Sequence, residues 1–302
     1  PYTTLFRSGA NSESIRGLAI DPRGNIYTCG AYTGTGDFDP GSNVLELTSA
    51  GESDVFITKM DWKGTLEWAR SIGGANAESV DDVTVDAQGS VYTMGVFRHI
   101  ADMDPGPGTA NLNVMGGVYA NMFVQKMDAS GQYVWAKQVT GSYFQFGSEI
   151  KTDGTDNLYI SGTFSETADF DPGPGTASLT ANGYDPFILN LDLDGKLVWA
   201  RHITGNGNIT EEAQSVCFDN EGAVYVCGTF SQTADFTPGP GRVQHDGRFG
   251  FGRRIFNEIG QCRQHGVGQA HGQYRHRRRR IAANRPLRKF VYAGQFRWHG
   301  GF

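Results

Sequence analysis

The chain has 302 residues and a net charge of −6 at pH 7, and 38% of its residues are hydrophobic. This length can bury a sizeable core, and no apolar run is long enough to span a membrane as a helix. The charge is divided unevenly. Residues 1–241 carry 12 Lys and Arg against 30 acids, a net of −18, whereas residues 242–302 carry 14 against two, a net of +12.

The first residues do not read as part of a fold. Residues 1–8, PYTTLFRS, resemble the translation of a common sequencing-adapter oligonucleotide. Segments of that kind are excluded from fold reasoning. We therefore expect residues 1–11 to be an adapter scar and lead-in.

From residue 12 to residue 241 the chain repeats with a period of about 66 residues, the spacing of a repeat architecture. One set of landmarks is a tyrosine six residues after an aspartate, at Tyr27, Tyr92, Tyr159 and Tyr225. A second set is a tryptophan four residues after a turn glycine, at Trp68, Trp135 and Trp199. A third is a phenylalanine, at Phe56, Phe123 and Phe187. We interpret the Trp and Phe series as packing between blades, because aromatics repeated at one position usually supply buried area.

Four short strands recur in each period. Around the first unit boundary they are predicted at residues 55–60, 66–72, 80–85 and 91–97, which alternate apolar and polar residues or are rich in β-branched and aromatic types. D-x-x-G turns such as Asp61–Gly64 and Asp86–Gly89 join them into tight hairpins. Two hairpins and a longer crossing make a propeller blade. The predicted fold is all-β: a β-propeller fragment of about four to four and a half four-stranded antiparallel blades.

The strings GNIYTCGAY, GSVYTMGVF, NLYISGTF and GAVYVCGTF, together with DVFITKMDWKGTLEWA, resemble the bacterial secreted β-propeller repeat often called the seven-bladed type. The resemblance covers about residues 12–241. It implies an extracellular or cell-surface array that takes part in interactions. A closed seven-bladed ring needs more units than these, so we expect the remaining blades to be missing from this chain.

The basic tail contains RHRRRR at Arg275–Arg280, which taken alone indicates nucleic-acid binding. Read one base out of register, however, the codons for Glu258–Gln269 permit KLDSAGNTVWAK. That string matches KMDASGQYVWAK at Lys126–Lys137, two periods earlier. We therefore expect residues 242–302 to be a frame-shifted continuation of the repeats, with one extra base near Pro238–Gly241. On this reading the chain binds no nucleic acid, and the tail packs irregularly with arginine where apolar residues belong.

One polar constellation repeats, an acidic loop of the form D-x-D-P-G that is expected after the fourth strand, between successive units and on one face. Its carboxylates are Asp37, Asp39, Asp102, Asp104, Asp169 and Asp171. The fourth copy has Asp235 but Thr237 in place of the second aspartate. Paired carboxylates and adjacent carbonyls suit calcium, although a calcium site needs six to eight oxygens. The favoured alternative is structural: the aspartates accept backbone amides, and Pro-Gly turns the chain toward the next blade.

No catalytic residue and no cofactor-binding residue is predicted. The two histidines outside the tail, His99 and His202, occupy different slots of different blades, and nothing in the sequence pairs either one with a carboxylate. We expect a non-catalytic secreted or cell-surface scaffold or recognition module whose partner is an unidentified protein or glycan. The alternative is a propeller enzyme acting on extracellular polysaccharide, which would need non-repeated carboxylates converging at a central channel.

Overall fold

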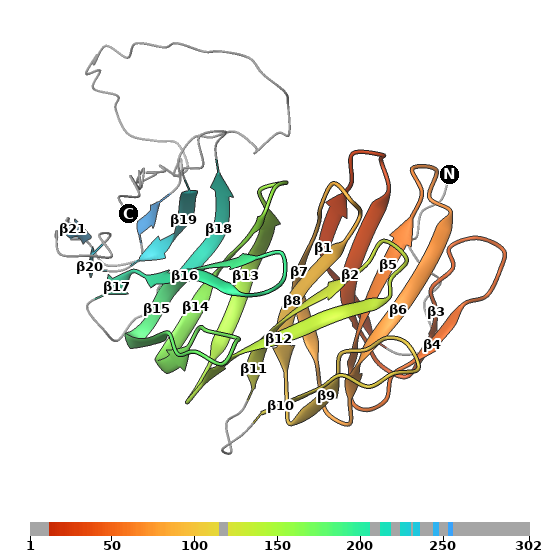
Figure 1. The fold of residues 1–302 in the computed structure, drawn as a ribbon, viewed down its shortest axis with the longest axis horizontal. Coiled ribbons are helices and arrows are strands. Elements are labelled where there is room, and N and C mark those ends of the chain that lie inside the picture. The colour runs from red at the N-terminus through yellow and green to blue at the C-terminus, as the bar shows by residue number, and fades with distance from the viewer. Residues whose placement is uncertain are drawn as a thin grey trace, which may run out of the picture.

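The computed structural model describes residues 12–114, 120–205, 212–218, 224–230, 232–235, 244–247 and 253–255. Every regular element in these ranges is a β-strand. Figure 1 shows the strands as a row of antiparallel sheets that stand side by side. Among the described residues, no helix is long and apolar enough to cross a membrane.

Three complete blades and part of a fourth follow one another along the chain. Blade 1 consists of β1 (Glu13–Ile20), β2 (Ile26–Tyr32), β5 (Asp54–Met60) and β6 (Leu66–Gly74). Blade 2 consists of β7 (Ser79–Val85), β8 (Val91–Phe97), β11 (Asn121–Met127) and β12 (Tyr133–Gly141). Blade 3 consists of β13 (Gln145–Thr152), β14 (Asn157–Asp169), β15 (Ser178–Asp192) and β16 (Leu197–His202). The described strands of blade 4 are β18 (Glu212–Phe218), β19 (Val224–Phe230) and β22 (Arg253–Ile255). The predicted propeller fragment is confirmed.

The tight hairpins close on the predicted D-x-x-G turns. At Asp61–Gly64, the Gly64 amide donates to the Asp61 carbonyl at 2.9 Å, and the Asp61 carboxylate accepts the amides of Lys63 and Thr65 at 2.8 Å each. Gly64 has φ 84°, a left-handed conformation that costs glycine little. The pairing shifts by one residue between Lys59 and Met60, as expected for a bulge-type hairpin.

The first strands of successive blades, β1, β7, β13 and β18, lie against one another along the array. Each contains a bulge at the same place, for example between Val80 and Asp82 in β7 and between Gly147 and Glu149 in β13. The two larger buried clusters each combine side chains from two neighbouring blades. The core therefore forms mainly by stacking blade on blade, as in other repeat proteins.

The position predicted for the acidic loop was wrong. It follows the second strand of a blade, not the fourth, and lies within the blade rather than between units. The loop belongs to a small accessory hairpin that reaches back to the preceding blade, where Asp102 pairs with Gly73 and Asp169 pairs with Thr140. The short accessory strands are β3 (Thr35–Asp37), β4 (Glu46–Thr48), β9 (Ile100–Asp102), β10 (Asn111–Asn113), β17 (Thr204–Gly205), β20 (Gln232–Asp235) and β21 (Gln244–Gly247). In blade 3 the outer parts of β14 and β15 form this hairpin.

Several expectations concern residues that the structure does not describe. The proposed adapter scar at residues 1–11 lies outside the described residues, as does the basic run at Arg275–Arg280. So do Thr237 and the arginine side chains of the tail. The expected frame shift and the irregular packing of the tail therefore remain predictions.

Candidate functional site

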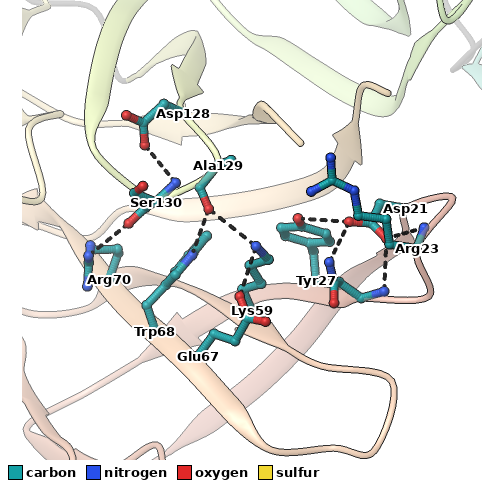
Figure 2. A network of polar contacts seen from close by, with 11 residues as sticks. Asp21, Arg23, Tyr27, Lys59, Glu67, Trp68, Arg70, Asp128, Ala129 and Ser130 are labelled. Atoms are coloured by element: carbon teal, nitrogen blue, oxygen red, sulfur yellow. Dashed lines mark hydrogen bonds and ion pairs between the residues drawn. The ribbon is translucent and has the colours of Figure 1, made fainter. Parts of the chain in front are cut away.

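A network of polar contacts joins blade 1 to blade 2 (Figure 2). Trp68 Nε1 and Lys59 Nζ both donate to the carbonyl oxygen of Ala129, at 3.2 and 3.4 Å. The guanidinium of Arg70 donates to the carbonyl oxygens of Gly131 and Ser130, at 2.9 and 3.0 Å. Ala129, Ser130 and Gly131 form the D-x-x-G turn of blade 2, so the last two strands of one blade clamp the turn of the next.

The clamp recurs at the next junction, where Trp135 Nε1 and Lys126 Nζ both donate to the Leu193 carbonyl, at 3.2 and 3.1 Å. The predicted role of the tryptophans in packing between blades is confirmed for Trp68 and Trp135. Among the phenylalanines, Phe123 and Phe187 belong to the buried clusters that combine two blades, whereas Phe56 packs within blade 1. The ring of Phe56 lies 5.0 Å from that of Phe38, the middle residue of its own blade's acidic motif, and Phe187 lies 4.9 Å from Phe170 in the same way.

The tyrosine landmark has a local explanation. Tyr27 Oη donates to Asp21 Oδ2 at 3.3 Å, and Tyr92 Oη donates to Asp86 Oδ2 at 3.0 Å, so each tyrosine supports the turn six residues before it. Burial, and then the negative charge of Asp21, raise the pKa of Tyr27 above its ordinary value. The phenol therefore stays protonated and keeps donating across the physiological pH range.

In the acidic loops the two aspartates bond to nearby backbone. Asp102 Oδ1 accepts the amides of Asp104 and Ala110 at 3.0 and 2.8 Å, and Asp104 Oδ1 accepts the amide of Gly106 at 2.8 Å. The first and third loops repeat this pattern with Asp37, Asp39, Asp169 and Asp171. Such bonds stabilise turns. The first aspartate closes the hairpin, and the second holds the Pro-Gly segment that follows it.

This donor set is a poor fit to calcium. In all three loops, one oxygen of each carboxylate already accepts backbone amides. In the part of the chain that the structure describes, no three His, Cys, Asp or Glu side chains are grouped so that they could hold a metal ion. A calcium ion needs six to eight oxygens. The geometry therefore favours the turn role, and calcium binding stays a prediction to be tested.

The innermost strands carry carboxylates that also join blades. Asp82 Oδ2 of β7 accepts the amide of Ile150 in β13 at 3.1 Å. Glu149 Oε2 of β13 accepts the amide of Val216 in β18 at 2.7 Å. Burial raises the pKa of Asp82 to about 6, although the Ile150 amide opposes that shift. Asp82 and Glu149 occupy the same position after the bulge of their strands, so they are a repeated feature, and each holds the next blade rather than standing free as a propeller enzyme's carboxylates would need to.

A buried acidic pair lies where blade 1 meets blade 2. Asp54 is 3% exposed and Glu78 is 2% exposed. Glu78 Oε2 accepts the Gly74 amide at 2.7 Å, and Asp54 Oδ2 accepts the Ala50 amide at 3.0 Å. The other carboxylate oxygen of each residue is buried without a hydrogen-bond partner. Burial raises the pKa of Glu78 to about 7, and the nearby charge of Asp54 adds to the shift.

Sequence reasoning paired neither histidine with a carboxylate, and the structure places His202 beside one. Its Nδ1 lies 3.3 Å from Oδ2 of the fully buried Asp185, within ion-pair distance but without a hydrogen bond. His202 occupies the slot of Ser71 in blade 1, three residues after the tryptophan, and Asp185 occupies the slot of Asp54. Aligning these slots across the repeats would have found the pair. His99 is exposed in the loop before β9, with φ 55°.

Comparison with known proteins agrees with this architecture. No family model matches the chain. Over 212 residues the chain is 26% identical to an uncharacterised WD repeat-containing protein of Acanthamoeba polyphaga mimivirus. WD repeats form propeller blades. The match covers 59% of this chain but only 14% of the relative, so the chain spans a small part of that protein's length.

Proposed function

We propose that this chain is a non-catalytic recognition or scaffold module, acting in secreted form or at a cell surface and built from repeats of the bacterial secreted type. The observation that carries the proposal is that the repeated polar groups of the chain have structural roles. The clamps, the turn aspartates and the inner-strand carboxylates all hold blades or turns together. The surface left over is a row of variable loops on a rigid array, a common arrangement for binding sites. Protein or glycan ligands both fit such a surface.

The enzyme alternative has one observation in its favour. Asp81, next to Asp82 in the bulge of β7, has a buried Oδ2 without a hydrogen-bond partner. Burial raises its pKa to about 6, against the opposing charge of Arg16. Glycoside hydrolysis uses two carboxyl groups that flank the scissile bond. Asp82 cannot readily serve as the second, because it is bonded to blade 3.

Affinity electrophoresis through gels that contain extracellular polysaccharides tests the proposal, with release of reducing ends assayed in parallel. Retardation without hydrolysis supports a recognition module. If the parent chain releases reducing ends and the Asp81→Asn variant does not, the enzyme alternative replaces the recognition module. Absence of retardation on every polysaccharide, together with no binding on an array of extracellular protein domains, would overturn the recognition role. Fractionation of cells that express the full-length gene tests the expected extracellular location.

A further inference from the structure

A recess of about 420 Å³ lies on blade 3, at its junction with blade 2. One side is the acidic loop, with Asp171, Gly173 and Gly175, and the other is the turn at Gly195 and Lys196. Lys137, from the last strand of blade 2, also lines it. This volume falls within the range of small-molecule sites, about 300–1,000 Å³. The lining therefore includes two lysines and one aspartate, on a chain whose net charge is negative.

The ammonium of Lys137 is available because the clamp changes at this junction. In blade 1 the equivalent residue, two positions after the tryptophan, is Arg70, which donates to both Gly131 and Ser130 of the next turn. Lys137 instead runs alongside the turn of blade 3. Its Cγ lies 3.1 Å from the position that a Cβ on Gly195 would occupy. It makes no hydrogen bond or ion pair with any of the described residues. Blade 3 therefore loses two clamp bonds, and a half-buried cation is left facing the recess.

The second lysine is also held only weakly. Lys196 Nζ lies 3.6 Å from Asp194 Oδ2, and both side chains are about three-quarters exposed, at 74% and 75%. Exposed pairs of this kind contribute little to stability. The equivalent residue in blade 2 is Gln132, so the corresponding place there lacks this positive charge. The two lysines together distinguish the recess of blade 3 from the same place in blade 2.

The glycines of the acidic loop leave room for the carboxylate of Asp171. Asp171 Oδ1 accepts the Gly173 amide at 2.8 Å. A Cβ added to Gly175 would lie 2.2 Å from Asp171 Oδ2, so a larger residue there would displace that carboxylate. With Gly175 in place, Asp171 Oδ2 accepts no hydrogen bond from any of the described residues, although Asp171 lines the recess.

We propose that this recess binds an acidic sugar, with the ligand carboxylate between Lys137 and Lys196 and a ring hydroxyl donating to Asp171. Ammonium–carboxylate hydrogen bonds are stronger than neutral ones. A neutral sugar would leave Lys137 without an anionic partner, and a simple dianion would meet the negative charge of Asp171. The ligand that satisfies all three groups carries one carboxylate and several hydroxyls, as a hexuronate does. This inference rests on the proposed recognition function and names its ligand class.

Calorimetric titration of the full chain with sodium glucuronate, and with a short oligouronate for higher affinity, tests the assignment. We expect binding that weakens on raising sodium chloride from 50 to about 500 mM, because salt screens exposed charges. Lys137→Gln should weaken it about fivefold or more, and Lys137→Gln combined with Lys196→Gln should abolish it. Lys63→Gln, an exposed lysine in the equivalent turn of blade 1, should leave it unchanged. Glucose should not bind.

The outcomes separate this inference from the function on which it rests. Uronate binding that survives the double lysine variant would place the site elsewhere and overturn the assignment. No uronate binding, with retardation by other polysaccharides intact, would overturn the ligand class while the recognition role stands. Loss of binding in the lysine variants must be accompanied by unchanged urea unfolding. A variant that fails this check is replaced by Lys137→Arg, which restores the clamping residue found at position 70 and should also reduce uronate binding.

Discussion

Replacing Glu78 with glutamine should stabilise the chain, although it removes a charged group that accepts a hydrogen bond. Glu78 is 2% exposed, and its second oxygen has no partner. Glutamine keeps an oxygen for the Gly74 amide and removes the charge from the buried site. A glutamine already occupies the corresponding position of blade 3, where the buried Gln145 donates from Nε2 to the Tyr143 carbonyl at 2.8 Å.

The size of the effect follows from the pKa. Burial raises the pKa of Glu78 from 4.5 to about 7. Below pH 4.5 the residue is protonated in both the folded and the unfolded chain and has no effect. As the pH rises from 4.5 to 7 the unfolded chain releases the proton first, so stability falls, and above pH 7 the penalty is constant. Each pH unit of difference costs about 1.4 kcal/mol, so the penalty at pH 8 is about 3 kcal/mol.

Urea unfolding followed by tryptophan fluorescence measures this at pH 5 and pH 8. We expect Glu78→Gln to raise the free energy of unfolding by about 3 kcal/mol at pH 8 and by about 1 kcal/mol at pH 5. The control, Glu46→Gln on the exposed strand β4, should change neither value. Equal stabilisation at both pH values would show that ionisation of Glu78 is not the cause. Destabilisation at pH 8 would refute the reasoning, because it would mean that the carboxylate has a cationic partner.

Other perturbations test the remaining parts of the structure. Trp68→Phe removes the hydrogen bond to Ala129 and should lower the free energy of unfolding in urea by about 1 kcal/mol. The control is Trp62→Phe, which replaces a side chain that is 68% exposed and should have no measurable effect. Equal losses of stability in the two variants would argue against the clamp. Asp102→Ala removes the acceptor of two loop amides and should destabilise by about 1–3 kcal/mol in the absence of any metal. Calorimetric titration with millimolar calcium should show no site in the acidic loops; specific heat lost in Asp102→Ala would instead establish the calcium alternative. Resequencing the DNA for residues 238–241 should reveal one extra base, and an intact frame that encodes the basic run would reject the frame shift.

Local patterns predicted the local structure closely. The strands expected at residues 55–60 and 80–85 are observed at Asp54–Met60 and Ser79–Val85, because alternation and turn residues act within a few positions. The left-handed turn positions were predicted equally well from the glycines of the D-x-x-G turns, since only a few residue types tolerate that conformation. The same local view placed the acidic loop after a fourth strand. Sequence periodicity fixes the order of strands but not which of them begins a blade.

Contacts between blades were harder to predict. The clamp of Lys59 and Trp68 on Ala129 spans 61–70 residues, and the turn contributes a backbone carbonyl that any residue could supply. The repeated tryptophan was visible and correctly interpreted, whereas the lysine beside it was overlooked although it recurs at Lys126. The buried pair of Asp54 and Glu78 was missed for a different reason. Each residue reads as an ordinary surface acid until the neighbouring blade covers it.

The described strand β22 bears on the tail without deciding its reading frame. In blades 1 to 3 the glycine of the second strand pairs with the phenylalanine of the third, as Gly95 does with Phe123. In blade 4, Gly228 pairs with Ile255, which lies 132 residues, or two periods, after Phe123. The third strand of blade 4 thus pairs with the second at the same position as in the other blades, and the frame shift stays a prediction. Residues that repeat, such as those of the clamp, hold the blades together. Where one residue differs, as Lys137 differs from Arg70, its side chain makes no hydrogen bond to the next turn and can bind a ligand instead.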